Sequence, residues 1–319
     1  MGQEEMAGVA AWLAAFLPGR ALLWEELLWA ARDHGWSAAE LDIRQHVQRM
    51  QQTGLVALVP GVVEQGGAKG AYRCSRCGEE ERLTVRLCQS CGRRCATCEA
   101  CLSMGRCRSC SVLVIGRTAP KPAAGRFASE REASWAPAWA GSLTFFQQQA
   151  ADMAVRLVRG ELLKKELLIH AVTGAGKTEM TFPAMAEALR RGLRVGVVTP
   201  RREVVLELAP RLGQAFPHVP TVALYGGAPD RWAMAPLMVM TIHQSLRFRR
   251  LFDLLIVDEV DAFPYHHDPM LPRAVAGALA DGGRMVYLTA TPPDELRERV
   301  ARGDVAAVTI PERHHGHPL

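Results

Sequence analysis

A glycine-rich turn after an apolar run is the first stretch of this chain that could do chemistry. Residues 167–180 read LLIHAVTGAGKTEM. This order predicts a buried strand, a turn whose backbone N–H groups converge, and a helix that begins near Lys177, which together form a phosphate site. Lys177 would reach the outer phosphates and Thr178 would hold Mg²⁺, although Ala171 stands where the strict GxxxxGK[ST] pattern has glycine. The residues expected to hold the nucleotide here are Thr173, Gly174, Ala175, Gly176, Lys177, Thr178 and Glu179.

Two carboxylates follow a second apolar run further along the chain. Asp258 and Glu259 come directly after residues 254–257, which read LLIV. Ligands of open α/β sheets bind at the carboxyl ends of the strands, so Asp258 would hold Mg²⁺ through water and Glu259 would polarise the attacking water. A strand that ends in Asp-Glu is common by itself. The ordered set of phosphate turn, carboxylate pair and a later Thr-Ala-Thr at 289–291 is much more specific.

Nine cysteines lie close together in the first half of the chain, mostly in C-x-x-C pairs. They are Cys74, Cys77, Cys88, Cys91, Cys95, Cys98, Cys101, Cys107 and Cys110. One C-x-x-C turn brings two thiolates to a tetrahedral Zn²⁺, and two turns complete a closed structural site. Four pairs therefore predict two zinc ions, with one of Cys95, Cys98 and Cys101 left over. The spacing leaves sequential and nested pairing of the turns open.

Arginines surround these cysteines, and they suggest a polyanion as a partner. They are Arg73, Arg76, Arg86, Arg93, Arg94, Arg106 and Arg108. Arginines on a metal-fixed scaffold suit a nucleic-acid backbone, and Arg93 and Arg94 are the pair that we select as DNA contacts. The acidic run at 79–81 and the negative charge of thiolate-rich zinc centres favour the alternative, a rigid knob that docks another protein.

The elements that would position the phosphate turn and the carboxylates alternate from residue 143 onward, as in a parallel sheet with crossover helices. After the strand at 167–169, strands are expected at 194–199, 221–225, 237–241, 254–257, 285–288 and 305–310. The predicted fold is α/β, with one RecA-like P-loop domain preceded by a cysteine-rich zinc module and a small helical domain. The expected boundaries are a winged-helix-like domain at 1–66, the zinc module at 67–115, a linker at 116–140 and RecA-like ATPase domain 1 at 141–319.

The first domain shows three helical patterns and turn signals. The expected elements are helices at 8–17, 22–34 and 37–52, the last capped by Ser37, and a hairpin that joins 55–58 to 62–63. This is the outline of a winged helix, and Arg44, Gln48 and Arg49 could face nucleic acid. A small docking domain with a solvated helix face is the alternative.

Composition and charge fit an ordinary globular chain of more than one domain. The 319 residues exceed the size that single cores usually reach, and the net charge of +5 is compatible with a polyanion partner without requiring one. The apolar segment at 6–18 is too short to cross a bilayer, and Glu4 and Glu5 before it have the wrong sign for a secretory signal. We therefore expect a cytoplasmic protein whose cysteines bind metal rather than form disulfides.

Taken together, these motifs resemble those of superfamily-2 helicases, in which the phosphate turn begins with alanine as it does at Ala171. Within that superfamily, four segments are similar to the ComFA family. They read CEACLSMGR at 98–106, PRREVVLEL at 200–208, TIHQSLRF at 241–248 and DEVDAFPY at 258–265. The resemblance covers roughly residues 58 to 319. ComFA proteins are late-competence ATPases implicated in pulling transforming single-stranded DNA into Gram-positive cells.

This resemblance implies roles for individual residues. ATP and Mg²⁺ would be bound and hydrolysed by Lys177, Thr178, Asp258 and Glu259. Thr289 and Thr291 would couple hydrolysis to strand movement. Gln147 would read adenine, with Gln148 as the alternative register. The positions that match contacts to the DNA backbone are Pro200, Arg201, Thr241 and His243.

The chain also departs from the family pattern. Motors of this type have a second RecA-like domain, whose arginine fingers complete the ATP site, and residue 319 comes before such a domain could begin. Arg313, in a histidine-rich tail, cannot replace a folded partner. We therefore expect a truncated or naturally fragmentary motor that binds ATP and DNA but hydrolyses ATP weakly by itself.

Two other functions are compatible with the same residues. One is a replication-restart helicase of the PriA type, although such proteins more usually carry DEEH where this chain has DEVD at 258–261. The other is a DNA-binding adaptor whose nucleotide pocket sets conformation without hydrolysis. The partners that the ComFA resemblance implies are single-stranded DNA, the membrane DNA channel and a ComFC-type competence protein, with homo-oligomers left open. Attachment to the inner face of the membrane would then come through partners.

Overall fold

The computed structural model describes residues 3–36, 40–66, 70–117, 135–172 and 174–311. The predicted cap at Ser37, the turn residue Thr173, most of the linker and the histidine-rich tail lie outside these residues. The chain forms two compact units. Unit 1 comprises Met1–Pro120, Leu246–Leu251 and Ala276–Ala278, and unit 2 comprises Lys121–Ser245, Phe252–Val275 and Leu279–Leu319. No helix among the described residues is both long and apolar enough to cross a membrane.

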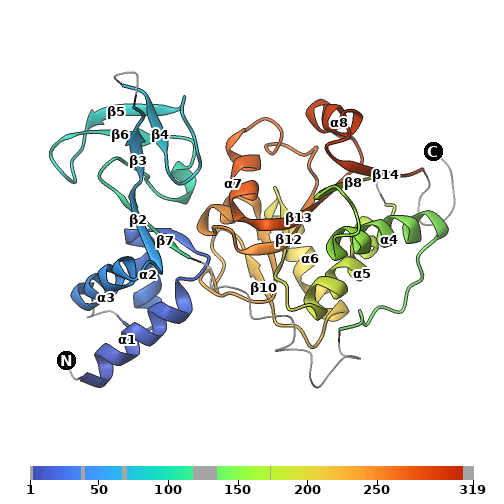
Figure 1. Cartoon of the computed structure of the whole chain (residues 1–319), viewed down its shortest axis with the longest axis horizontal. Coiled ribbons are helices and arrows are strands. Elements are labelled where there is room, and N and C mark those ends of the chain that lie inside the picture. Colours follow the sequence, from blue (N-terminus) through green and yellow to red (C-terminus); the bar gives the residue numbers. More distant parts are fainter. Residues whose placement is uncertain (1–2, 37–39, 67–69, 118–134, 173, 312–319) are drawn as a thin grey trace. The chain divides into compact units, whose positions relative to one another are not determined.

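Unit 2 is built on a seven-stranded parallel sheet with the order β10-β11-β9-β12-β13-β8-β14 (Figure 1). The strands are β8 (Glu166–Ala171), β9 (Val195–Thr199), β10 (Thr221–Leu224), β11 (Leu237–Thr241), β12 (Phe252–Asp258), β13 (Leu279–Thr289) and β14 (Ala306–Ile310). Every strand predicted in this region is present. The central strand β12 is buried along its whole length, which explains its unbroken apolar sequence.

Helices connect the strands of this sheet. They are α4 (Phe145–Arg159), α5 (Lys177–Arg190), α6 (Arg202–Ala215), the 3₁₀ helix η3 (Ile242–Arg247), α7 (Met270–Ala278) and α8 (Asp294–Ala301). The last residues of η3 and of α7 belong to unit 1. The RecA-like α/β architecture predicted from the alternating pattern is confirmed.

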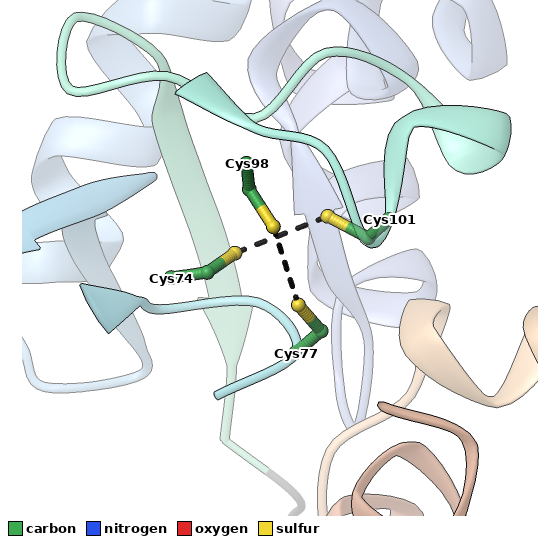
Figure 2. A group of neighbouring side chains, drawn as sticks. All are labelled: Cys74, Cys77, Cys98 and Cys101. Atoms are coloured by element: carbon green, nitrogen blue, oxygen red, sulfur yellow. Dashed lines mark hydrogen bonds between the residues drawn. The ribbon is translucent and has the colours of Figure 1, made fainter. Parts of the chain in front are cut away.

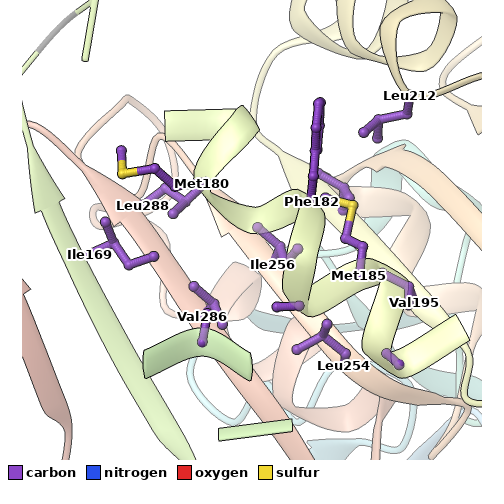
Figure 3. Close-up of a cluster of buried hydrophobic side chains, with 14 of the residues drawn as sticks. Ile169, Met180, Phe182, Met185, Val195, Leu212, Leu254, Ile256, Val286 and Leu288 are labelled. Carbon is purple, nitrogen blue, oxygen red and sulfur yellow. The ribbon is translucent and has the colours of Figure 1, made fainter. Parts of the chain in front are cut away.

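The core of unit 2 lies between α5 and the sheet. Met180, Phe182 and Met185 of α5 are buried near strand side chains that include Ile256 and Val286, as Figure 3 shows. Burying an apolar side chain of this size contributes about 1.5–3 kcal/mol each. This packing fixes the first turn of α5 relative to the strand ends, and therefore positions the residues of the phosphate turn.

The described part of unit 1 contains α-helices, a short 3₁₀ helix and short antiparallel sheets. The helices are α1 (Gln3–Phe16), α2 (Trp24–Asp33), α3 (Glu40–Gln52) and the 3₁₀ helix η1 (Leu102–Met104). The strands are β1 (Ala21–Leu23), β2 (Val56–Pro60), β3 (Val62–Glu64), β4 (Tyr72–Cys74), β5 (Leu83–Leu87), β6 (Arg94–Cys98) and β7 (Val112–Gly116). They form one sheet of order β1-β7-β2 and the pairs β3-β4 and β5-β6.

The hairpin predicted across Pro60-Gly61 does not form. Instead, β2 pairs with β7, which follows the last cysteine, and β3 pairs with β4. Gly61 is the point where the chain leaves the first sheet, and a Cβ there would lie 2.8 Å from the Sγ of Cys107 and 2.7 Å from the carbonyl of Arg108. The glycine therefore serves a close approach to the cysteine region rather than a tight hairpin turn.

Candidate functional site

Five neighbouring strands of unit 2 end side by side, and the predicted site residues follow their carboxyl ends. Because the strands are parallel, these ends form one edge of the sheet, which we call the carboxyl edge. The last residues of these strands are, in spatial order, Thr241 of β11, Thr199 of β9, Asp258 of β12, Thr289 of β13 and Ala171 of β8. The expected DNA contacts thus lie towards one side of the carboxyl edge and the phosphate turn towards the other.

The phosphate turn has the backbone that its glycines predict. Gly174 has a φ of 81°, and Gly176, the residue before α5, has a φ of 67°, both in the left-handed region that glycine adopts without strain. The Nζ of Lys177 donates to the carbonyls of Ala171 and Val172, at 3.1 and 3.4 Å. The ammonium therefore lies within the turn, next to the helix N-terminus that would face an anion.

Gln147 holds this turn from α4. Its Nε2 donates to the carbonyl of Ala175 at 2.8 Å, and its Oε1 accepts from the backbone N–H of Thr144 at 2.7 Å. Gln148 points elsewhere, to Asp152. The structure thus places Gln147 rather than Gln148 against the phosphate turn. Its role in reading adenine stays a prediction.

The carboxylate pair lies at the end of β12. Asp258 is buried, and this burial, helped by repulsion from Glu259 and Asp261, raises the pKa of its carboxyl from 3.8 to about 6. The backbone N–H of Glu259, which donates to Asp258 Oδ1 at 2.9 Å, and the charge of Lys177 oppose that rise. A buried carboxylate with a raised pKa beside a phosphate turn suits a group that is completed by a bound cation.

Asp261 is a third carboxylate near the end of β12. In the sequence it stands out only as the last residue of the DEVD run at 258–261. Its Oδ2 accepts from the hydroxyl of Thr291 at 2.5 Å. Burial favours a higher pKa for Asp261, but the hydrogen bonds from Thr291 and Thr289 outweigh burial and lower it. Thr289 Oγ1 in turn accepts from the backbone N–H of Thr291 at 3.0 Å. The Thr-Ala-Thr segment is therefore connected to the carboxylates by hydrogen bonds.

The residues expected to touch DNA lie at or just after the ends of β9 and β11, which pair with each other. Pro200 and Arg201 come after β9, and the Arg201 side chain is 55% exposed. Thr241 ends β11, and His243 lies in η3, where burial lowers its pKa and Asp268 partly offsets that effect. Glu179, expected at the nucleotide, forms an ion pair with Arg211 of α6.

The cysteines of unit 1 form two groups with the geometry of zinc sites. Figure 2 shows Cys74, Cys77, Cys98 and Cys101 pointing toward one another. The Sγ atoms of Cys77 and Cys98 are 3.6 Å apart and those of Cys74 and Cys101 are 3.9 Å apart. Tetrahedral Zn–S bonds of about 2.3 Å separate sulfurs by roughly 3.8 Å, so a zinc ion fits this group.

The second group forms near the turn of the β5-β6 hairpin. It consists of Cys88, Cys91, Cys95 and Cys110. The separations of Sγ atoms that define it are 3.7 Å between Cys88 and Cys110 and 3.3 Å between Cys91 and Cys95. The pairing is neither sequential nor nested but interleaved, because Cys98 and Cys101 join the turn at 74–77 while Cys110, which follows them in the chain, joins the turn at 88–91.

The prediction that the spare cysteine is one of Cys95, Cys98 and Cys101 is wrong. Those three are divided between the groups, and Cys107 is the residue left outside both. Its Sγ lies 3.7 Å from that of Cys74 and donates to the carbonyl of Gly61 at 3.1 Å. The motif Cys107-x-x-Cys110 is split because only Cys110 reaches the hairpin turn, so its spacing misled the assignment.

The arginines of the cysteine region divide into exposed and buried ones. Arg93 and Arg94 are exposed at the β5-β6 turn, where a polyanion could reach them. Arg76 is different, since its guanidinium is buried and donates to Glu26 Oε2 at 2.8 Å and to the Met104 carbonyl at 2.7 Å. Glu26 also accepts from Arg247 at 3.0 Å. Arg76 therefore belongs to a buried ion cluster of unit 1 and not to a nucleic-acid surface.

Comparison with known protein families gives two adjacent matches. A family described as "Competence protein ComFA N-terminal domain" matches residues 8–115, and "DEAD/DEAH box helicase" matches residues 146–299. The first match contains all nine cysteines, and the second contains the phosphate turn and the carboxylates. The chain thus has an N-terminal ComFA region followed by a helicase domain.

Among solved structures, the chain has matches of low sequence identity. The chain is similar to "DEAD-box helicase Mss116 bound to ssRNA and UDP-BeF", with 18% identity and a TM-score of 0.42, over 52% of this chain and 40% of that one. It is also similar to a hypothetical ATP-dependent RNA helicase from Sulfolobus tokodaii, with 22% identity and a TM-score of 0.43, over 53% of this chain and 54% of that one.

Similarity to curated proteins is much higher. "Competence protein ComFA" of Bacillus subtilis is 42% identical over 254 residues, which are 79% of this chain and 52% of that protein. "Competence protein ComFA" of Streptococcus pneumoniae is 43% identical over 181 residues, which are 57% of this chain and 41% of that protein. The chain therefore spans about half the length of these relatives. With its N-terminal region and helicase domain both matched, and with this identity to curated ComFA proteins, the chain belongs to the ComFA family.

Proposed function

We propose that this chain is the first motor domain of an ATP-driven, single-stranded DNA translocase for DNA uptake in natural transformation, joined to its zinc module. The observation that carries the proposal is the grouping at the carboxyl edge, where the phosphate turn after β8 and the carboxylates at the end of β12 lie on either side of β13. Lys177 would bind the outer phosphates, and Thr178 and Asp258 would hold Mg²⁺. Glu259 would orient and polarise the attacking water.

Strand binding is proposed for the adjacent part of the carboxyl edge. Pro200 and Arg201 follow β9, Thr241 ends β11 and His243 comes after it. These strands lie one and two places from β12, which ends at Asp258 and is followed by Glu259. Because β9 and β12 are neighbouring strands, a DNA phosphate bound at the end of β9 can influence the carboxylates at the end of β12 directly. The zinc module adds the exposed Arg93 and Arg94. Zinc would be held by the two four-cysteine groups and would stabilise a region too small for its own core.

Hydrolysis by this chain alone is expected to be weak. Phosphoryl transfer needs positive charge on the developing transition state, and in helicases of this type a second RecA-like domain supplies it. Arg201, which follows β9, is paired with Glu259. Membrane DNA channels and ComFC-type proteins are the partners proposed from the family, and attachment to the inner face of the membrane would be indirect.

The test is phosphate release with and without single-stranded oligothymidylate, in this chain and in a chain extended to the length of its relatives. We expect slow release that the oligonucleotide stimulates, with a larger rate in the extended chain, and loss of release in both on Glu259→Gln. Glu203→Gln, which changes an exposed carboxylate in the first turn of α6, is the matched control and should keep the wild-type rate.

An adaptor that binds DNA without hydrolysis would give a different result. Fluorescent ATP and the oligonucleotide would both bind to the extended chain. Its phosphate release would be at the background rate, and Glu259→Gln would not lower that rate further. That outcome would overturn the motor proposal.

A further inference from the structure

Arg201 and Glu259 form an ion pair between two neighbouring strand ends of unit 2. Arg201 follows β9, Glu259 follows β12, and these strands pair in parallel. Arg201 Nε lies 3.3 Å from Glu259 Oε2. Within the described part of the chain, no donor hydrogen-bonds this oxygen, which is itself buried. Arg201 is therefore the positive charge that compensates the proposed catalytic carboxylate.

The backbone of Glu259 is held in an unusual conformation. Its φ is +54°, in the left-handed region that residues other than glycine rarely adopt, and such residues cluster at functional sites and switches. Its N–H is bonded to Asp258 Oδ1 at 2.9 Å. The geometry thus directs the Glu259 side chain towards β9 and Arg201 instead of leaving it free to rotate with the loop.

Arg201 is also accessible to a second anion. Its side chain is 55% exposed, and a guanidinium binds phosphate oxygens as readily as carboxylate oxygens, often through two parallel hydrogen bonds. A phosphodiester backbone laid along the ends of β9 and β11 would compete with Glu259 for the same guanidinium. The two anions cannot both have the best geometry with one Arg201 side chain.

We propose that the Arg201–Glu259 pair is a strand-sensing latch. Without a polynucleotide, Arg201 holds the Glu259 carboxylate away from the attacking water; a backbone phosphate draws Arg201 off and frees the carboxylate for hydrolysis. The latch rests on the proposed function, because it names how a bound strand would control that same site. Because Glu259 and the strand compete for Arg201, removing the charge of Glu259 should strengthen binding of the strand.

Arg202 supplies a matched control. It is the next residue, at the first position of α6, and carries the same charge. Its guanidinium lies 4.9 Å from the ring centroid of Tyr225, so it is engaged with an aromatic ring rather than with Glu259. Replacing either arginine removes one positive charge from the same region, but only Arg201→Ala breaks the latch.

The decisive experiment measures fluorescence anisotropy of a labelled oligothymidylate without nucleotide, at fixed salt. Glu259→Gln should tighten binding about two- to fivefold, the size expected for a partly exposed ion pair. In the Arg201→Ala background Glu259→Gln should have no effect, and in the Arg202→Ala background it should tighten binding as in the wild type. Thermal unfolding by circular dichroism confirms that every variant is folded.

Phosphate release without polynucleotide gives an independent readout. Arg201→Ala should raise this basal rate about two- to fivefold for the same reason, and Arg202→Ala should not change it. Equal tightening by Glu259→Gln with and without Arg201, or a fall in the basal rate of Arg201→Ala, would overturn the latch alone. Failure of the wild-type chain to bind the oligonucleotide would overturn the proposed function and the latch with it.

Discussion

Replacing Asp258 with asparagine should stabilise the chain near neutral pH when nucleotide and Mg²⁺ are absent. Asp258 is 8% exposed, and burial raises the pKa of its carboxyl from 3.8 to about 6. One pKa unit corresponds to about 1.36 kcal/mol, so the ionised carboxylate costs the folded state at most about 3 kcal/mol. Asparagine has nearly the same shape, and its Oδ1 can still accept from the Glu259 N–H.

The pH dependence has a definite sign. Below pH 3.8 Asp258 is protonated in both the folded and the unfolded chain and carries no penalty. Between 3.8 and about 6 the unfolded chain releases the proton and the folded chain keeps it, so the wild type loses stability as pH rises. Above about pH 6 the penalty is complete. The advantage of Asp258→Asn should therefore be full at pH 7 to 8 and should vanish towards pH 4.

The assay is urea unfolding followed by circular dichroism across this pH range, in Mg²⁺-free buffer without chelators, because chelators would also remove zinc. Asp261→Asn is the control with the opposite sign. Its hydrogen bonds with Thr291 and Thr289 lower the pKa of Asp261 in the folded state, so this substitution should destabilise at neutral pH and become neutral in acid. An Asp258→Asn variant that is less stable than the wild type at pH 7.5 would refute the burial argument.

Three further predictions concern other parts of the molecule. Cys107→Ser should keep two zinc ions per chain by inductively coupled plasma mass spectrometry, whereas Cys74→Ser should keep one; equal losses would contradict the interleaved grouping that leaves Cys107 out. Glu26→Ala leaves the Arg76 guanidinium buried without its carboxylate, so it should lower the free energy of unfolding of unit 1 by about 3–5 kcal/mol in urea titrations, and a loss below about 1 kcal/mol would be inconsistent with a buried pair. Lys177→Ala should weaken binding of fluorescent ATP roughly 10- to 100-fold, since hydrogen bonds to charged groups contribute about 1.5–3 kcal/mol; unchanged affinity would place the phosphates elsewhere.

Much of unit 2 could be read from the sequence because its signals are local. The run that becomes β12 is buried on both faces and therefore apolar throughout, and the phosphate turn needs Gly174 and Gly176 for its left-handed backbone. The positions of Lys177 and Asp258 follow from such signals, since parallel strands bring their carboxyl ends to one edge whatever the details of packing.

The tertiary structure decided which distant residues meet. Within a C-x-x-C turn the spacing brings two thiols together, but whether Cys110 joins Cys88 or Cys74 depends on the path of β6 and β7 through unit 1. The same long-range pairing replaced the predicted hairpin at Pro60-Gly61 with contacts of β2 to β7. Arg76 looked like its neighbours in sequence, yet it is buried against Glu26, fifty residues earlier in the chain.

The role of a charged residue could be predicted from the sequence more readily than its ion-pair partner. The order of motifs predicts that Glu259 is the catalytic carboxylate, and the family resemblance predicts that Arg201 contacts the DNA backbone. Their pairing could not be read from the sequence, since it requires β9 and β12 to be neighbours in a sheet whose order differs from the order along the chain. Sequence determines which groups reach the carboxyl edge of this protein, and strand order determines which of them touch.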